Sequence, residues 1–140
     1  MRHPRISIQK LPSGKYVVTD PSYVLNEIDY LEIRSQVLNE CASGEIIDHN
    51  GDKLIVFETY FGDDIYEDLN GNKYPVDDGM IAAIPLDMCN NEFLKDILEN
   101  GFGQLIITDA QAVCFNDDGV ITIGEISIDT KKEFVYENSI

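Results

Sequence analysis

The sequence predicts an α+β fold, in which a mostly antiparallel β-sheet of seven or eight strands has two helices packed on it. The chain has 140 residues, the usual size of one domain, so a single core over residues 1–140 is expected. Short β-prone runs alternate with Asn-Gly and other turn sequences. Only residues 26–42 and 90–99 place apolar side chains at helical spacing. Strands linked mostly by hairpins, with few helices, indicate the α+β class.

The strand predictions follow from turn signals. Ten runs are β-prone, of which seven or eight are expected to form strands. In chain order they are residues 6–9, 16–19, 45–48, 53–60, 65–67, 73–74, 80–84, 104–108, 112–115 and 120–128. The proline and the glycine of Leu-Pro-Ser-Gly at residues 11–14 suit a turn and predict a hairpin between the first two runs, and Asn-Gly pairs at residues 50–51 and 70–71 predict two more. Residues 120–128 are largely apolar on both faces, which is typical of one central strand.

Each predicted helix has its own end signals. For the first helix, Asn26 or Ser22 is suited to the N-cap and Gly44 to the exit. Its apolar stripe, interrupted by the single polar residue Arg34, comprises Tyr30, Ile33, Val37, Leu38 and Cys41. For the second helix, Asn90 or Asn91 begins the pattern and Gly101 ends it. Its predicted inward residues are Phe93, Leu94, Ile97 and Leu98.

The charge of the chain is strongly negative. There are 26 Asp and Glu residues against 10 Lys and Arg residues, a net charge of −16. Residues 16–130 hold only four of the cations but 24 of the acids, so this segment alone carries −20. Such a field repels phosphate and attracts cations or basic protein surfaces, so we do not expect direct binding of nucleic acid. The simpler alternative is that acidity serves only solubility.

The cysteines and the apolar runs predict a cytoplasmic protein. Cys41, Cys89 and Cys114 are widely spaced and odd in number, which favours reduced, buried thiols. No uncharged apolar run approaches the roughly 18 residues of a membrane span. The first residues lack an apolar export segment, so we expect a cytosol, of a cell or of an infected cell, and no membrane partner.

Catalytic templates are poorly represented. The chain has two histidines, His3 and His49, and the turn around His49 predicts an exposed loop histidine. Residues 13–16, Ser-Gly-Lys-Tyr, lack the glycine spacing of a phosphate loop and the serine or threonine that follows its lysine, and residues 68–72 break the calcium-loop pattern. Aspartates in turns more often bond local backbone than metal. No catalytic residue, metal ligand or cofactor is therefore predicted.

The candidate partner-binding residues combine tyrosines with carboxylates near predicted strand ends. They are Asp20, Tyr23, Tyr60, Asp63, Asp64, Tyr66, Asp68, Asp77 and Asp78. Tyrosine supplies large, stiff contact area and carboxylates complement arginine, so such a surface suits a basic protein. The alternative is structural, with Asp20 as a turn or capping residue and Tyr23 as a core ring whose hydroxyl is satisfied.

Three of these segments carry a resemblance. They read Asp-Pro-Ser-Tyr-Val-Leu at residues 20–25, Gly-Asp-Asp-Ile-Tyr at residues 62–66 and Val-Asp-Asp-Gly-Met-Ile at residues 76–81. About half of the chain resembles a group of small uncharacterised proteins of bacteriophages and their hosts. Asp64 stands where that group usually has glycine and Asp78 where it has serine. The resemblance implies a phage or mobile-element setting and therefore the bacterial host cytosol. Short proteins in that setting often antagonise host machinery.

The leading hypothesis is therefore a non-enzymatic binding protein. It would occupy a basic surface of a host defence, nuclease or nucleic-acid-binding protein, as a phage inhibitor or an immunity protein. One alternative is a metal-dependent site that binds or hydrolyses a nucleotide, built from Asp20, Asp63, Asp64, Asp77 and Asp78. A second alternative is a minor virion or assembly component.

Overall fold

The computed structural model describes residues 7–131 of the chain. Its helices are η1 (Pro21–Tyr23), α1 (Glu27–Asn39), η2 (Leu86–Met88) and α2 (Asn91–Asn100). Its strands are β1 (Gln9–Leu11), β2 (Gly14–Thr19), β3 (Ile46–His49), β4 (Asp52–Glu58), β5 (Asp64–Glu67), β6 (Lys73–Val76), β7 (Met80–Pro85), β8 (Gln104–Thr108), β9 (Ala112–Asp117), β10 (Val120–Ile123) and β11 (Ile126–Asp129). The predicted α+β class with antiparallel pairing is confirmed, with eleven strands in the described residues rather than seven or eight.

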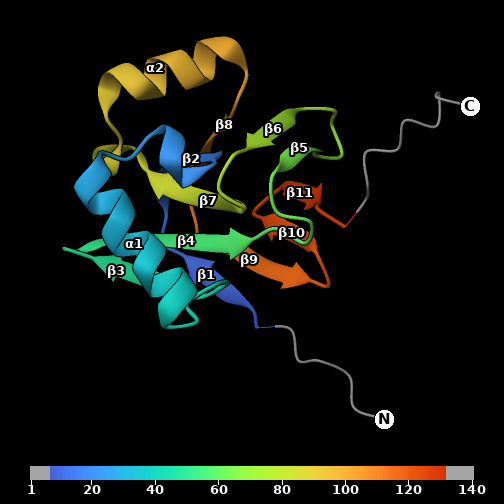
Figure 1. Ribbon diagram of the computed structural model, residues 1–140, viewed down its shortest axis with the longest axis horizontal. Helices are drawn as coiled ribbons and strands as arrows, with labels where there is room; N and C mark the ends of the chain where they lie inside the picture. The colour runs from blue at the N-terminus through green and yellow to red at the C-terminus, as the bar shows by residue number, and fades with distance from the viewer. Residues whose placement is uncertain (1–6, 132–140) are drawn as a thin grey trace, which may run out of the picture.

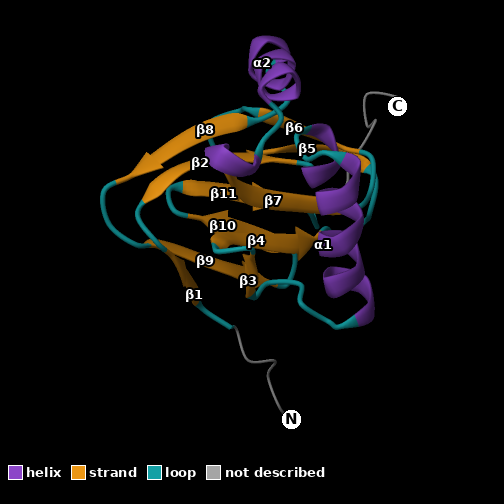
Figure 2. Cartoon of the chain, turned by 90° about the vertical axis from the view of Figure 1, so that its left-hand side faces the viewer, coloured by secondary structure: helices purple, strands orange, loops and turns teal. Residues whose placement is uncertain are grey.

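The fold has three layers (Figures 1 and 2). A five-stranded sheet in the order β3-β4-β7-β2-β8 lies between the helices and a four-stranded sheet in the order β1-β9-β10-β11. Along β7, Ile81 and Ala83 pack towards the four-stranded sheet, whereas Ala82 and Ile84 pack towards the helices. Because both faces of β7 are covered, its sequence is a continuous apolar run instead of an alternation.

Both hairpins predicted from Asn-Gly pairs are present. β3 and β4 are joined by Asn50 and Gly51, whose φ angles of 55° and 94° suit the mirror-image turn that matches strand twist. β5 and β6 form a separate two-stranded unit that packs its tyrosines Tyr66 and Tyr74 into the core between the sheets.

Two strand predictions are wrong. β1 does not pair with β2 but with β9 in the other sheet, because the turn after Leu11 carries the chain from one layer to the next. Residues 120–128 are not one strand but β10 and β11, which fold back on each other at Gly124 with φ 60°. Folding back places Ile121, Ile123 and Ile128 together in the core, which a single straight strand would not do.

The helices begin where their caps predict. Asn26 Oδ1 accepts a hydrogen bond from the Asp29 amide at the start of α1, and Asn90 Oδ1 accepts two at the start of α2. The buried stripes are narrower than predicted, since Leu38 and Cys41 on the α1 side and Phe93 and Leu98 on α2 are exposed. α2 covers only one margin of the middle sheet (Figure 2), so only part of its surface finds a partner layer. No helix within residues 7–131 is long and apolar enough to cross a membrane.

Candidate functional site

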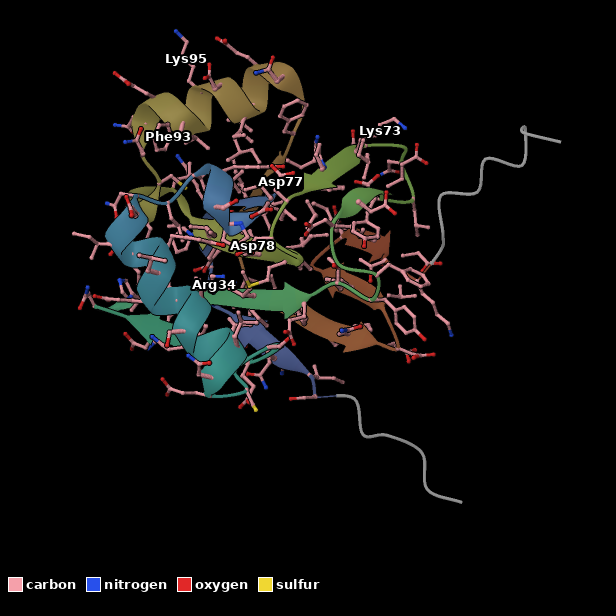
Figure 3. All side chains as sticks on the ribbon, viewed as in Figure 1. Arg34, Lys73, Asp77, Asp78, Phe93 and Lys95 are labelled. Carbon is pink, nitrogen blue, oxygen red and sulfur yellow. The ribbon has the colours of Figure 1, made fainter. Side chains whose placement is uncertain are left out.

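Three segments far apart in the sequence meet beside the start of β7. They are the β2–η1 junction at residues 20–23, the β4–β5 loop at residues 59–63 and the β6–β7 loop at residues 77–79. The Thr59 amide donates to the Gly79 carbonyl at 2.9 Å, and the Thr59 hydroxyl donates to the Gly62 carbonyl at 2.7 Å. Figure 3 shows Asp77 and Asp78 between α1 and the β5–β6 hairpin. Parts of the three sequence segments at residues 20–25, 62–66 and 76–81 therefore lie together in space.

Asp20 is the buried anchor of this cluster. Its side chain is fully buried, and its two oxygens share four hydrogen bonds. Oδ1 accepts from the amide and the hydroxyl of Ser22, both at 2.8 Å, which caps η1. Oδ2 accepts from the amides of Asp77 at 2.7 Å and Asp78 at 3.2 Å. Asp20 therefore has the capping role given as its structural alternative, because its carboxylate faces inward, caps η1 and holds two loops together.

Two pairs of ionisable side chains lie next to Asp20, which are Arg34 with Asp78 and Tyr23 with Asp77. Arg34, the polar residue on the α1 stripe, donates from Nε to Asp78 Oδ2 at 2.9 Å and so ties α1 to the β6–β7 loop. Burial, and next the nearby charge of Asp20, raise the pKa of Asp78. Burial likewise raises the pKa of Tyr23 well above its usual value, and its hydrogen bond to Asp77 adds to that shift. Tyr23 is consequently a neutral donor to Asp77 at physiological pH.

A second buried aspartate organises the β5–β6 turn. Asp68 Oδ1 accepts from the amides of Asn70 and Asn72, and Oδ2 accepts from the Asn72 side chain and from the Tyr74 hydroxyl at 2.7 Å. Burial alone would raise the pKa of Asp68, but the hydrogen bonds from Tyr74, Asn72 and Asn70 together lower it. Tyr66 is also buried and donates to the Gly62 carbonyl. Asp68 and Tyr66 are therefore buried scaffold residues whose polar side-chain atoms form hydrogen bonds within the fold.

Of the remaining members of the candidate set, Tyr60, Asp63 and Asp77 are exposed, whereas Tyr23, Asp64 and Asp78 are half-buried. We use the name acidic-aromatic surface for Tyr60, Phe61, Asp63 and Asp77. Tyr60 is 53% and Phe61 45% exposed, and their rings meet edge to face at 4.8 Å between centroids. Asp63 and Asp77 are exposed on the two adjoining loops, whereas Asp64 is half-buried and bonds the amide of its own neighbour. Phe61 was absent from the predicted set although it follows Tyr60 directly.

The loop that carries Tyr60 is fixed to the four-stranded sheet. The Tyr60 amide donates to Thr130 Oγ1 at 3.0 Å, and the Thr130 hydroxyl donates in turn to the Gly119 carbonyl. Lys131 Nζ lies 5.9 Å from the centre of the Tyr60 ring and pairs with Asp118. The aromatic pair is thus displayed on a braced loop.

Few cations offset the acids of the described chain. Residues 7–131 contain 7 Lys and Arg residues against 24 Asp and Glu residues, a net charge of −17. Four of these cations form local ion pairs, which are Arg34–Asp78, Lys53–Asp48, Lys73–Glu67 and Lys131–Asp118. None of these pairs involves Asp63 or Asp77, so the acidic-aromatic surface keeps its negative charge.

His49 does not lie where its turn sequence suggests. It was expected to be an exposed loop residue, but it is 7% exposed, at the end of β3 beside the first turn of α1. Its Nε2 lies 2.9 Å from Asp29 Oδ1 and 3.7 Å from Glu32 Oε2. In the described part of the chain, this is the one group of three His, Cys, Asp or Glu residues whose donor atoms are close enough to share a metal ion. No local sequence signal joins these residues, because only tertiary packing brings β3 against α1.

Comparisons with known proteins give no match to this chain, whether to protein-family models, curated proteins or solved structures.

Proposed function

We propose that this protein is a non-enzymatic binding protein whose acidic-aromatic surface occupies a basic surface of another protein. The observation that carries the proposal is the pairing of exposed carboxylates, Asp63 and Asp77, with the exposed rings of Tyr60 and Phe61 on adjoining loops. Carboxylates complement arginine, and stiff aromatic side chains dominate binding energy in many protein interfaces.

The bracing of these loops supports a binding role. Three hydrogen bonds fix the backbones of these loops. The Thr59 hydroxyl donates to the Gly62 carbonyl, and the Tyr60 amide donates to Thr130 Oγ1. The Asp77 amide donates to Asp20 Oδ2. A surface that is ordered before binding loses less conformational entropy when it docks. These buried hydrogen bonds would therefore increase affinity by ordering the loops before binding, although their own side chains do not contact the partner.

The charge supports the choice of partner. Residues 7–131 carry a net charge of −17, which attracts basic protein surfaces to the molecule and repels naked phosphate backbones. We place the partner among host defence proteins, nucleases or nucleic-acid-binding proteins, whose basic surfaces normally hold phosphate. The resemblance to phage and host proteins supports a role as an inhibitor or an immunity protein.

A metal-dependent nucleotide site on the same loops is less well supported. Both oxygens of Asp20 already accept hydrogen bonds, and Arg34 pairs with Asp78. The loop acids also do not form a group of donor atoms close enough to share one ion among the described residues.

The test is affinity capture from bacterial lysate with immobilised full-length protein at low and high salt. Three proteins are compared, which are the wild type, the Asp63→Lys/Asp77→Lys variant and a control, Glu92→Lys/Glu99→Lys, that changes the net charge equally on α2. We expect capture of a basic protein that high salt weakens. The loop variant should reduce the amount captured at least tenfold, and the α2 control less than threefold, about 0.6 kcal/mol.

Several outcomes would count against the proposal. They are capture that is equally weakened by both variants, capture that is insensitive to salt, an acidic captured partner and the absence of any captured protein. Tight binding of naked DNA or RNA in metal-free buffer would also contradict it. Tyr60→Ala should weaken binding of the captured partner by about 2 kcal/mol, because the aromatic pair lies in the proposed interface.

A further inference from the structure

His49, Asp29 and Glu32 form a compact cluster away from the acidic-aromatic surface. Asp29 and Glu32 lie three residues apart near the start of α1 and therefore share one face of the helix. His49 ends β3, just before the two-residue turn into β4. Its ring is more than nine-tenths buried, and its Nε2 points to both carboxylates.

The spacing of the three donor atoms fits a small divalent ion. Zinc bonds of about 2.0–2.2 Å in a tetrahedral arrangement place neighbouring donors about 3.3 Å apart. The two distances from Nε2, 2.9 Å and 3.7 Å, lie on either side of that value, and the donor atoms all lie within 4.8 Å of one another. Glu32 is the most exposed of the three, with 57% of its side chain accessible, so it can close the remaining distance.

A simple ion pair leaves part of the cluster unexplained. One Nε2 hydrogen satisfies one carboxylate, and the oxygen of Glu32 at 3.7 Å is beyond hydrogen-bond length. None of the ion pairs formed by described lysines and arginines involves Asp29 or Glu32. Two carboxylates therefore face one imidazole with no other basic side chain paired to either, an arrangement that favours an added cation.

We propose that Asp29, Glu32 and His49 bind a divalent transition-metal ion of the zinc class. An imidazole nitrogen favours zinc, cobalt or nickel over magnesium or calcium, which prefer oxygen donors alone. Metal binding uses the Nε2 lone pair, so the ring then carries its hydrogen on Nδ1. Three protein ligands leave a fourth position for water, and the ion fastens the start of α1 to the β3–β4 hairpin.

The test measures metal binding by the full chain after treatment with a chelator. Calorimetry with zinc chloride should show one ion per chain with a dissociation constant on the order of 10 µM. Free zinc at ten times that constant should raise the melting temperature by about 5 °C, whereas magnesium at the same concentration should not. Cobalt should give the visible absorption of a tetrahedral site.

Matched variants separate this site from general attraction of cations to an acidic protein. His49→Asn and Glu32→Gln should weaken zinc binding at least tenfold and threefold, respectively. His3→Asn, the other histidine, and Glu92→Gln, which removes the same charge from α2, should leave it unchanged. Should His49→Asn fail to fold, the Nε2 chemical shift of His49 in the wild type decides, because zinc must move it. Equal zinc affinity in His49→Asn, an equal effect of magnesium, an unmoved Nε2 shift or no binding below about 1 mM zinc would overturn the proposal.

Discussion

Asp20 and Asp68 differ sharply from Asp63 and Asp77, although all four were predicted to contact a partner. The first two are buried and each accepts four hydrogen bonds, which hold the η1 junction and the β5–β6 turn in place. The second two are exposed on loops that the first pair helps to position. The comparison teaches that the acids of this chain serve two purposes, and that hydrogen-bond donors around a carboxylate decide which.

The largest effect is expected when one carboxylate oxygen is replaced by an amide nitrogen, in a buried aspartate and in an exposed one. Asp20→Asn should lower the free energy of unfolding by about 3 kcal/mol, because an amide nitrogen cannot accept from the buried donors that now meet that oxygen. Asp63→Asn, on the exposed loop, should change it by less than about 0.5 kcal/mol. Urea unfolding at neutral pH measures both. Similar losses in the two variants would remove the distinction between scaffold and surface acids.

The β5–β6 turn provides a second, smaller test. Asp68→Asn should cost about 2 kcal/mol and Tyr74→Phe about 1 kcal/mol, since each disturbs the buried bond between carboxylate and hydroxyl. The double variant should lose less than the sum, because both changes remove the same interaction. Additive losses in thermal or urea unfolding would mean that the two side chains act independently.

The pH dependence of stability should distinguish Asp68 from the surface acids. Its pKa is lowered from the model-peptide value of 3.8 in the folded state, so its contribution is fully present above that value. The contribution is lost as the pH falls through the lower, folded pKa. The stability gap between the wild type and Asp68→Asn should therefore narrow progressively as the pH falls from neutral through 3.8 and below. A gap that widens on acidification would give the opposite sign and contradict the hydrogen-bond account.

Cysteine labelling should resolve the smallest, local effects. Burial raises the pKa of Cys89 to about 12 and that of Cys114 to about 11, so both should react slowly, whereas exposed Cys41 should react first. Cys89 adjoins Asn90, whose amide donates to the Val24 carbonyl beside η1. Asp20→Asn should therefore accelerate labelling of Cys89 more than that of Cys114.

The converse is expected on the other side of the middle sheet. Cys114 lies in the same core cluster as Tyr74, so Asp68→Asn should accelerate labelling of Cys114 more than that of Cys89. Mass spectrometry of partly labelled protein gives both rates. Equal acceleration of the two thiols by each variant would indicate global unfolding in place of local opening.

Local signals predicted the local structure well. Asn26, Asn90 and the Asn-Gly turn at residues 50–51 act as expected, because each is governed by hydrogen bonds and dihedral preferences within a few residues. The assignment of residues 120–128 to one strand failed for the same reason. Gly124 permits the tight turn, but the gain that selects it is the burial of Ile121 and Ile128 against distant residues.

The sequence by itself determined the antiparallel α+β character, the helix starts and the excess of negative charge, all of which depend on neighbouring residues or on composition. Only the tertiary structure decided that β1 joins β9, that Asp20 and Asp68 lie inside while Asp63 and Asp77 lie outside, and that His49 meets Asp29. The physical reason is that burial and hydrogen-bond pairing depend on residues distant in the chain. An aspartate has the same local preference for a turn whether or not a second loop later covers it with amide donors.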